Sequence, residues 1–196
     1  LNYKQAMNRG KFVHELKKEK KRFDKYKVLT PYKREDLPSD AKIISTVWAF
    51  KQKADGSARG RMNARGYEQH SGVHYEPDSI SSPVTNSNTI RVCLTLYAAQ
   101  KRWVAAVIDV EAAFLQGKFY NGEVMYIDIP EGFEEYYPED CVLKMNVPLY
   151  GTKQAAACFH KTLIEKLRDK RNVTRSMADP CMYHTRIDGR LVVILS

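Results

Sequence analysis

A short apolar run that carries an acidic residue near its end is the feature that most constrains the fold of this chain. Residues 105–110 (AAVIDV) are small or β-branched apart from Asp109, and small residues, the aromatic Phe114 and Gly117 follow them. This pattern predicts a buried strand that delivers a carboxylate to a turn. A carboxylate in such a place needs a hydrogen-bonded cap, a cation or an exit to solvent. Asp109 is therefore either a turn cap or a ligand for a divalent metal, with Phe114 shaping whatever binds beside that metal.

Length and charge bound the class of protein. The 196 residues can form one domain, or one domain with a small subdomain, around a sizeable core. The net charge of +9 favours an anionic partner, of which nucleic acid is the commonest, although a membrane surface attracts the same charge. The sequence contains no run of about 18 apolar residues, so we expect no spanning helix and an intracellular location. The four widely spaced cysteines argue against a zinc site and against disulfides.

Both ends suggest a piece of a longer polypeptide. The sequence begins with Leu1 rather than Met, and it stops at Ser196 directly after the apolar run 191–195. A native domain seldom stops inside a core strand, because the strand then lacks the turn that closes it. We therefore expect the natural polypeptide to extend beyond these residues.

Hydrophobic periodicity predicts an α+β fold with an antiparallel sheet. Helical spacing of Phe12, Leu16, Lys20 and Phe23 indicates a basic helix over residues 3–26, followed by a loop at 30–40. The other predicted elements are helices at 89–102 (capped by Ser87 or Asn88) and 153–170, and strands at 103–110, 124–129 and 142–145, with a turn at Asn121 and Gly122. This order fits an incomplete ferredoxin-like arrangement, the split βαβ fold.

Two hairpins are predicted from Asp-Gly pairs between alternating arms. Asp55 and Gly56 lie at the centre of residues 42–65, and a second such pair joins residues 182–185 to 190–195. On the return arm of the first hairpin, Arg59, Arg61 and Arg65 share one face. Planar guanidinium groups suit bidentate contact with phosphate oxygens. The alternative is that this charge only keeps an exposed ribbon soluble.

Three segments occur in a fixed order that is more specific than any one of them. They are RMNARGYEQ at 61–69, IDVEAAFL at 108–115 and LYGTKQA at 149–155, supported by residues 126–133 and 178–183. With these motifs the sequence resembles the reverse transcriptase of Ty1/copia-type retrotransposons from about Val28 to the end. The resemblance implies a fingers hairpin and a palm built on the split βαβ sheet. The implied domains are a basic helix and linker at 1–40, fingers at 41–103, and a C-terminally truncated palm at 104–196 with fingers elements interleaved.

The resemblance also implies residue roles. Asp109 would be the first catalytic aspartate and would hold Mg²⁺ together with the Val110 carbonyl, with two ions expected in the full-length enzyme. Phe114 would crowd the ribose 2′ position and reject ribonucleotides. The other implied nucleotide ligands are the side chains of Arg59, Arg61 and Gln154 and the backbone N–H groups of Ala112 and Ala113. The implied nucleic-acid contacts are Lys51, Lys53, Arg65 and Lys153.

By the same resemblance, the partners are an RNA template, a DNA primer and deoxynucleoside triphosphates. Flanking integrase and ribonuclease H domains and a location in a cytoplasmic particle or the nucleus are implied, and no membrane. The family's Tyr-x-Asp-Asp turn does not occur before Ser196, so we expect the 196 residues alone to be inactive. Glu111, Thr152 and residues 156–159 depart from the family pattern, which leaves a decayed copy or a divergent lineage open.

Two other classes of function remain open. The first is a nucleic-acid-binding relic or domesticated module without catalysis, which would bind RNA–DNA duplex with salt dependence but not extend a primer. The second is a palm-like metal enzyme that acts on free nucleotides, such as a cyclase, and needs no template. Taken singly, Tyr150 and Gln154 indicate packing at a helix start and polar surface.

Overall fold

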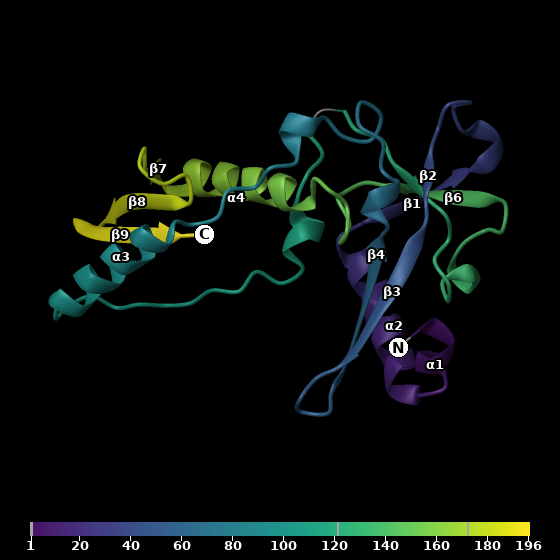
Figure 1. Cartoon of the computed structure of the whole chain (residues 1–196), viewed down its shortest axis with the longest axis horizontal. Helices are drawn as coiled ribbons and strands as arrows, with labels where there is room; N and C mark the ends of the chain where they lie inside the picture. Colours follow the sequence, from purple (N-terminus) through teal and green to yellow (C-terminus); the bar gives the residue numbers. More distant parts are fainter. Residues whose placement is uncertain (1, 121, 172) are drawn as a thin grey trace. The chain divides into compact units, whose positions relative to one another are not determined.

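The computed structural model describes residues 2–120, 122–171 and 173–196 (Figure 1), so the predicted turn at Asn121 and Gly122 lies partly outside the described residues. The chain divides into two compact units, which are described separately below. The first unit is Leu1–Ile80 with Ala112–Phe159, and the second unit is Ser81–Glu111 with His160–Ser196. Of the helices in the described ranges, none combines the length and the apolarity that crossing a membrane requires.

The first unit begins with two helices where the sequence predicts one. Helix α1 is Tyr3–Met7 and α2 is Gly10–Lys25, and they are separated because Asn8 caps the first while Arg9 adopts an extended backbone. Helix α2 has one buried face, which carries Phe12, Leu16, Glu19 and Phe23. The predicted pattern placed Lys20 on this face, and the structure buries the neighbouring acid instead.

A four-stranded sheet follows in the first unit, in the order β1-β6-β5-β2. The strands are β1 (Leu29–Lys33), β2 (Ile43–Ile44), β5 (Tyr126–Ile127) and β6 (Cys141–Met145). The predicted strand at 142–145 is confirmed, whereas the one at 124–129 shortens to two residues. Strand β1 forms where a loop was predicted, because β6 supplies a hydrogen-bonding partner along its whole length. Its Pro31 is tolerated because β1 lies at the edge of the sheet.

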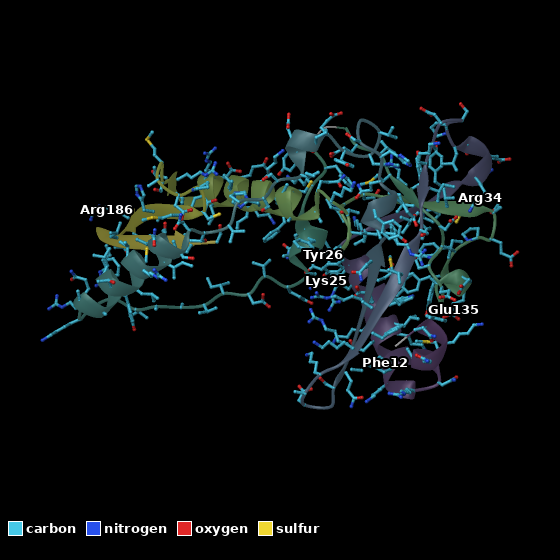
Figure 2. The ribbon with its side chains drawn as sticks, in the orientation of Figure 1. Phe12, Lys25, Tyr26, Arg34, Glu135 and Arg186 are labelled. Atoms are coloured by element: carbon cyan, nitrogen blue, oxygen red, sulfur yellow. The ribbon has the colours of Figure 1, made fainter. Side chains whose placement is uncertain are left out.

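The predicted first hairpin is confirmed as β3 (Thr46–Gln52) and β4 (Ala58–Ala64). Gly56 adopts φ +78° in its turn, which an L side chain rarely tolerates. Trp48, Phe50 and Met62 form the buried face of this ribbon, and Phe12 of α2, labelled in Figure 2, packs on Phe50 at 5.4 Å between ring centroids. The alternation of buried and exposed residues in β4 therefore leaves the arginines on the other face.

Short 3-10 helices connect these elements, and Arg34 at the start of one of them, labelled in Figure 2, forms an ion pair with Asp128 at 2.8 Å. The 3-10 helices of the described residues are η1 (Arg34–Asp36), η2 (Gly66–Glu68), η3 (Pro77–Ser79), η4 (Ala113–Gln116) and η5 (Glu134–Tyr136).

The second unit contains α3 (Ser87–Ala99) and a three-stranded sheet of β7 (Thr174–Arg175), β8 (Met182–Ile187) and β9 (Arg190–Leu195). Helix α4 (Ala155–Arg171) begins in the first unit and its residues from His160 belong to the second. The predicted second hairpin is confirmed, with positive φ at both Asp188 and Gly189, as a type I′ turn requires. Helix α3 is capped by Asn86, one residue before the predicted cap.

The predicted strand at 103–110 is wrong in this structure. Residues 103–110 have no regular secondary structure, and Val107 and Ile108 are 101% and 86% exposed. The run has strand propensity, but a strand also needs a neighbour to share its backbone hydrogen bonds, and among the described residues none pairs with it.

The fold class is therefore a mixed α+β arrangement with several antiparallel sheets. Across the part of the chain that the structure describes, three small sheets replace the predicted antiparallel sheet, and β2 pairs in parallel with β5. The parallel pair was not predicted because the two strands are separated by about eighty residues and are two residues long, which leaves no local pattern to detect.

Candidate functional site

The exposed face of the first hairpin is basic in a way that its own packing does not explain. Lys51 lies directly opposite Arg59 in the β3–β4 register, and Lys53 extends the same arm. Lys51, Lys53 and Arg59 are all exposed. Like charges that face each other across two strands destabilise the pair. An anion bound on this face would relieve that repulsion.

Arg61 is held against an aromatic ring. Its guanidinium carbon lies 4.9 Å from the centroid of the Tyr150 ring, within the range of a cation–π interaction. Tyr150 is buried, and its burial raises the pKa of the hydroxyl, with the negative charge of Glu19 adding to the effect. Arg61 is consequently anchored through one face of its guanidinium group.

The same tyrosine also contacts Phe114. The rings of Phe114 and Tyr150 lie 5.8 Å apart between centroids at an interplanar angle of 55°. Two predicted nucleotide ligands that are separated by more than fifty residues thus meet at one ring. Taken singly, Tyr150 was predicted only to pack at a helix start, although its position inside the LYGTKQA motif could have indicated a larger role.

Backbone contacts fix Tyr150 to the end of β4. The N–H of Ala64 donates to the carbonyl of Tyr150 at 2.8 Å. Gly151 has φ +87°, and a Cβ there would collide with the Ala64 carbonyl, while a Cβ on Gly66 would collide with the carbonyl of Gly151. Only glycines permit so close an approach, so the 149–151 turn and β4 form one rigid unit.

Ala112 and Ala113 lie where the chain turns into η4. Ala112 has φ +50°, a left-handed conformation that costs a non-glycine residue about 1 kcal/mol. The N–H of Leu115 bonds back to the Ala112 carbonyl at 2.9 Å. The N–H groups ahead of Leu115 are those that the first turn of a helix directs toward external acceptors. Such local strain often accompanies a binding role.

Gln154 is buried, and protein groups engage both ends of its side-chain amide. Its Oε1 accepts from Gln69 Nε2 at 2.9 Å, and its Nε2 donates to the His74 carbonyl at 2.9 Å. Gln69 Oε1 in turn accepts the backbone N–H of Lys153 at 2.7 Å. Burial lowers the pKa of His74, so this residue favours its neutral form. The network joins the start of α4 to residues 69–74.

Lys153 and Arg65 are also held by neighbours. Lys153 Nζ donates to the Tyr75 hydroxyl at 2.8 Å and lies 4.4 Å from the centroid of its ring. Arg65 Nη1 lies 3.9 Å from Glu68 Oε1, and hydrogen bonds from Ser45 lower the pKa of Glu68. Both cations are therefore partly neutralised or shielded within the first unit.

Asp109 and Val110 belong to the second unit. Asp109 is exposed and Val110 is 37% exposed, and both precede the left-handed Ala112 in the chain. Within residues 2–120, 122–171 and 173–196, no three His, Cys, Asp or Glu side chains are grouped so that they could hold a metal ion. Asp109 offers one carboxylate, and magnesium usually takes one or two from a protein while phosphates and water complete its shell.

A basic hairpin face and the contacts of Arg61 and Phe114 with one aromatic ring suit an anionic partner, and the comparison with protein families identifies the class. The family model for reverse transcriptase (RNA-dependent DNA polymerase) matches residues 29–196. The chain belongs to this family. Its curated relatives place it among the Ty1/copia-type reverse transcriptases of retrotransposon Pol polyproteins.

Three relatives illustrate the similarity. The retrovirus-related Pol polyprotein from transposon TNT 1-94 of Nicotiana tabacum is 32% identical over 169 residues, covering 84% of this chain and 12% of the relative. Those from transposons RE1 and RE2 of Arabidopsis thaliana are 34% and 33% identical, each over 64% of this chain and 9% of the relative. The chain thus spans about a tenth of their length. No solved structure matches it.

Proposed function

We propose that this chain forms the nucleotide-binding part of a retrotransposon reverse transcriptase, which in the complete polypeptide extends a DNA primer on an RNA template. The observation that carries the proposal is the contact of Arg61 and Phe114 with one ring, that of Tyr150. In the proposed assignment the β3–β4 hairpin belongs to the fingers, and residues 104–196 contribute the palm with fingers elements interleaved.

The proposed binding steps follow from the charges and shapes of the first unit. Arg61, with Arg59 beside it in β4, neutralises the triphosphate, and its anchoring on Tyr150 removes the entropy cost of ordering a long side chain. Backbone N–H groups of Ala112 and Ala113 donate to phosphate oxygens. Phe114, whose ring packs on that of Tyr150, crowds the 2′ position of the ribose and so selects deoxyribose.

Asp109 and the Val110 carbonyl would hold magnesium in this proposal. Both supply the hard oxygen donors that magnesium prefers, and the exposure of Asp109 leaves it accessible to a metal–nucleotide complex. Two bound divalent ions in the complete enzyme would stabilise negative charge on the attacking and leaving oxygens of phosphoryl transfer.

The remaining basic residues would contact the template and primer. Lys51 and Lys53 project from the exposed face of the hairpin, where contacts with phosphates would be salt-dependent. Gln154 would act indirectly, by positioning its neighbours. Its Oε1 accepts a hydrogen bond from Gln69, and Gln69 in turn accepts one from the backbone N–H of Lys153. The proposal also includes flanking integrase and ribonuclease H domains in the same polyprotein. The proposed location is a cytoplasmic particle or the nucleus.

Substitution of the proposed catalytic aspartate tests this function. Asp109→Asn in the complete polypeptide should lower primer extension on an RNA template with Mg²⁺ by about a thousandfold, because the metal loses its carboxylate. Asp36→Asn, an exposed acid in η1, is the matched control and should extend normally. Extension by Asp109→Asn at the wild-type rate would refute the assignment, and the isolated 196 residues should not extend at all.

A second outcome would favour the non-catalytic alternative. If the complete polypeptide binds RNA–DNA duplex with salt dependence but adds no nucleotide, the chain is a binding module that has lost polymerisation. The net charge of +9 supports this alternative, because it favours binding to nucleic acid whether or not catalysis occurs. Incorporation of nucleotides without any template would instead identify an enzyme that acts on free nucleotides.

A further inference from the structure

Lys153 is a partly buried cation of the first unit whose contacts are all with neutral groups. Its Nζ donates to the Tyr75 hydroxyl at 2.8 Å and lies 3.5 Å from the Gln69 carbonyl oxygen. Lys20 and Arg22, which are also partly buried, each pair with a carboxylate. Among the described residues no carboxylate pairs with Lys153. Because a charge withdrawn from water is costly without a counter-charge, an external anion would stabilise this ammonium group.

Lys153 and Tyr75 present hydrogen-bond donors side by side. An ammonium group has three N–H donors, and the two oxygens named above engage at most two of them. The Tyr75 hydroxyl accepts from Lys153, so its own proton is directed elsewhere, and no acceptor for it occurs in the part of the chain that the structure describes. Both side chains are only partly buried. A single phosphate group could therefore accept from both, and lysine and tyrosine are common phosphate ligands in nucleic-acid complexes.

Gln69 contacts Lys153 at both its backbone and its side chain. Gln69 Oε1 accepts the backbone N–H of Lys153 at 2.7 Å, and its carbonyl oxygen faces the ammonium group. Gln69 is 4% exposed, so its amide has little access to competing water. Gln69 thus fixes where Lys153 leaves the backbone and limits where its ammonium group can lie.

Gln154 fixes the orientation of the Gln69 amide. Gln154 Oε1 accepts from Gln69 Nε2 at 2.9 Å, which leaves Gln69 Oε1 to face Lys153. Gln154 Nε2 donates to the His74 carbonyl at 2.9 Å. One chain of hydrogen bonds therefore runs from His74, the residue before Tyr75, to Lys153. Because buried amides are costly to leave unpaired, this chain sets the separation of Tyr75 and Lys153.

The segment that carries Lys153 also carries Tyr150, which holds Arg61. The Arg61 guanidinium lies 4.9 Å from the Tyr150 ring centroid, and the Lys153 ammonium lies 4.4 Å from that of Tyr75. In one pair residues 149–155 supply the ring, and in the other they supply the cation. Two cation–aromatic pairs on one segment suit two different phosphates, one of an incoming nucleotide and one of a nucleic-acid strand.

We propose that Lys153 and Tyr75 together bind one phosphodiester group of the template–primer duplex, and that Gln69 is the positioning residue that sets their separation. This inference rests on the proposed function. It adds to that function the Tyr75 hydroxyl as a second ligand of the phosphate, and the residue that holds the two ligands together.

The test is equilibrium binding of an RNA–DNA duplex to the 196-residue chain over a range of salt concentrations. Tyr75→Phe should weaken binding by about fivefold, because it removes one hydrogen bond to a charged group and keeps the ring. The dependence on salt should stay as in wild type, because a hydroxyl displaces no counterion. Lys153→Gln should weaken binding by about tenfold and lower the slope of log affinity against log salt by about one.

Matched controls come from β1 of the same unit. Tyr32→Phe removes a hydroxyl that donates to the Asp36 carbonyl at 3.2 Å, and Lys33→Gln removes an exposed lysine. Both should change duplex binding by less than about twofold. Thermal unfolding shows whether each variant is folded. Tyr75→Phe, which keeps its ring, decides the test if Lys153→Gln does not fold.

A double-mutant cycle tests the positioning role. Gln69→Leu should weaken duplex binding by about fivefold in the wild-type chain and by less than about twofold in the Lys153→Gln background, because Gln69 acts through Lys153. A merely structural role would weaken binding alike in both backgrounds, and that result would overturn the positioning role. Gln69→Glu, which cannot donate to Gln154, is the second variant if Gln69→Leu does not fold, with the same expected pattern.

The outcomes separate this inference from the proposed function. If Lys51→Gln weakens duplex binding while Tyr75→Phe and Lys153→Gln match the controls, the inference is overturned and the proposed function stands. If wild type binds no duplex, the template contact of the proposed function is itself refuted. Binding of dATP with Mg²⁺ should stay within about twofold of wild type in both variants. Weaker dATP binding with unchanged duplex binding would assign the pair to the free nucleotide and overturn the inference.

Discussion

The two units of this chain treat their apolar residues differently. The contiguous core cluster, from Ala6 to Tyr150, lies entirely in the first unit. In the second unit none of the described residues of α3 is buried, and Val104, Val107 and Ile108 face solvent. The hairpin that carries the arginines therefore rests on its own core, whereas the segment that carries Asp109 has no comparable support. The proposed binding residues of the first unit therefore rest on a packed core, whereas Asp109, the residue proposed for catalysis, lies in an exposed segment.

Truncation of buried and exposed leucines gives the largest expected contrast. Leu143→Ala should lower the free energy of unfolding by about 3 kcal/mol, because Leu143 is fully buried in β6. Leu94 in α3 is 59% exposed, and Leu94→Ala should change the unfolding free energy by less than about 0.5 kcal/mol. Urea denaturation followed by circular dichroism measures both. A large loss of unfolding free energy for Leu94→Ala would show that the α3 surface is covered in solution. The two units would then not differ in how they bury apolar residues.

Glycines in the two units should differ by a smaller amount. Gly151→Ala should destabilise the first unit by about 2 kcal/mol, because its left-handed backbone adds to a collision with the Ala64 carbonyl. Gly189→Ala, at the tip of the second hairpin, meets no atom within 4 Å and should cost about 1 kcal/mol from backbone strain alone. Equal shifts in thermal midpoint would mean that the close approach at Gly151 relaxes.

Two buried acids should give opposite pH dependences. The Thr89 hydroxyl, with the backbone N–H groups of Cys181 and Asn86, lowers the pKa of Asp179 in the second unit. Burial raises the pKa of Glu19 in the first unit. Asp179 thus adds stability above its unfolded value of about 3.8, which is lost as the pH falls through the folded pKa. Glu19 adds stability below about 4.5, which is lost as the pH rises through its folded pKa.

Matched neutral variants sharpen that contrast. At neutral pH, Asp179→Asn should lower the urea midpoint and flatten its acid dependence, since a hydrogen-bonded carboxylate is lost. Glu19→Gln should leave the midpoint unchanged or raise it, since the buried charge is removed. A lower midpoint for Glu19→Gln would mean that the ion pair of Glu19 with Arg22 outweighs the cost of burial.

Local signals explain what the sequence predicted correctly. The Asp-Gly pairs at 55–56 and 188–189 specify their own turns, and period-two alternation assigned Arg59 and Arg61 to the exposed face of β4. The strand prediction for residues 103–110 was wrong because a strand needs a pairing partner elsewhere in the chain, and a local sequence pattern does not reveal whether one exists. Strand β1 was missed for the converse reason, since its pairing with β6 overrides the turn signal of Pro31.

The site was predictable in its parts and not in its connections. Arg61 and Phe114 were identified through motif order, but nothing in the spacing of the sequence indicates that Tyr150 contacts both. The burial of Glu19 was missed because this residue lies in a lysine-rich stretch, and the helical pattern alone accommodated Lys20 equally well. The roles of Asp109 and Val110 in metal binding and of Gln154 in nucleotide contact stay predictions.

The position of Pro31 has a consequence for how the molecule behaves at high concentration. The outer strand β1 presents an imino acid that has no N–H to donate, and β2 on the opposite side of that sheet is two residues long. Neither offers a template onto which a second molecule would add its own strand. The four-stranded sheet should therefore resist fibril-like self-association through its edges, even though a large fraction of the chain is apolar.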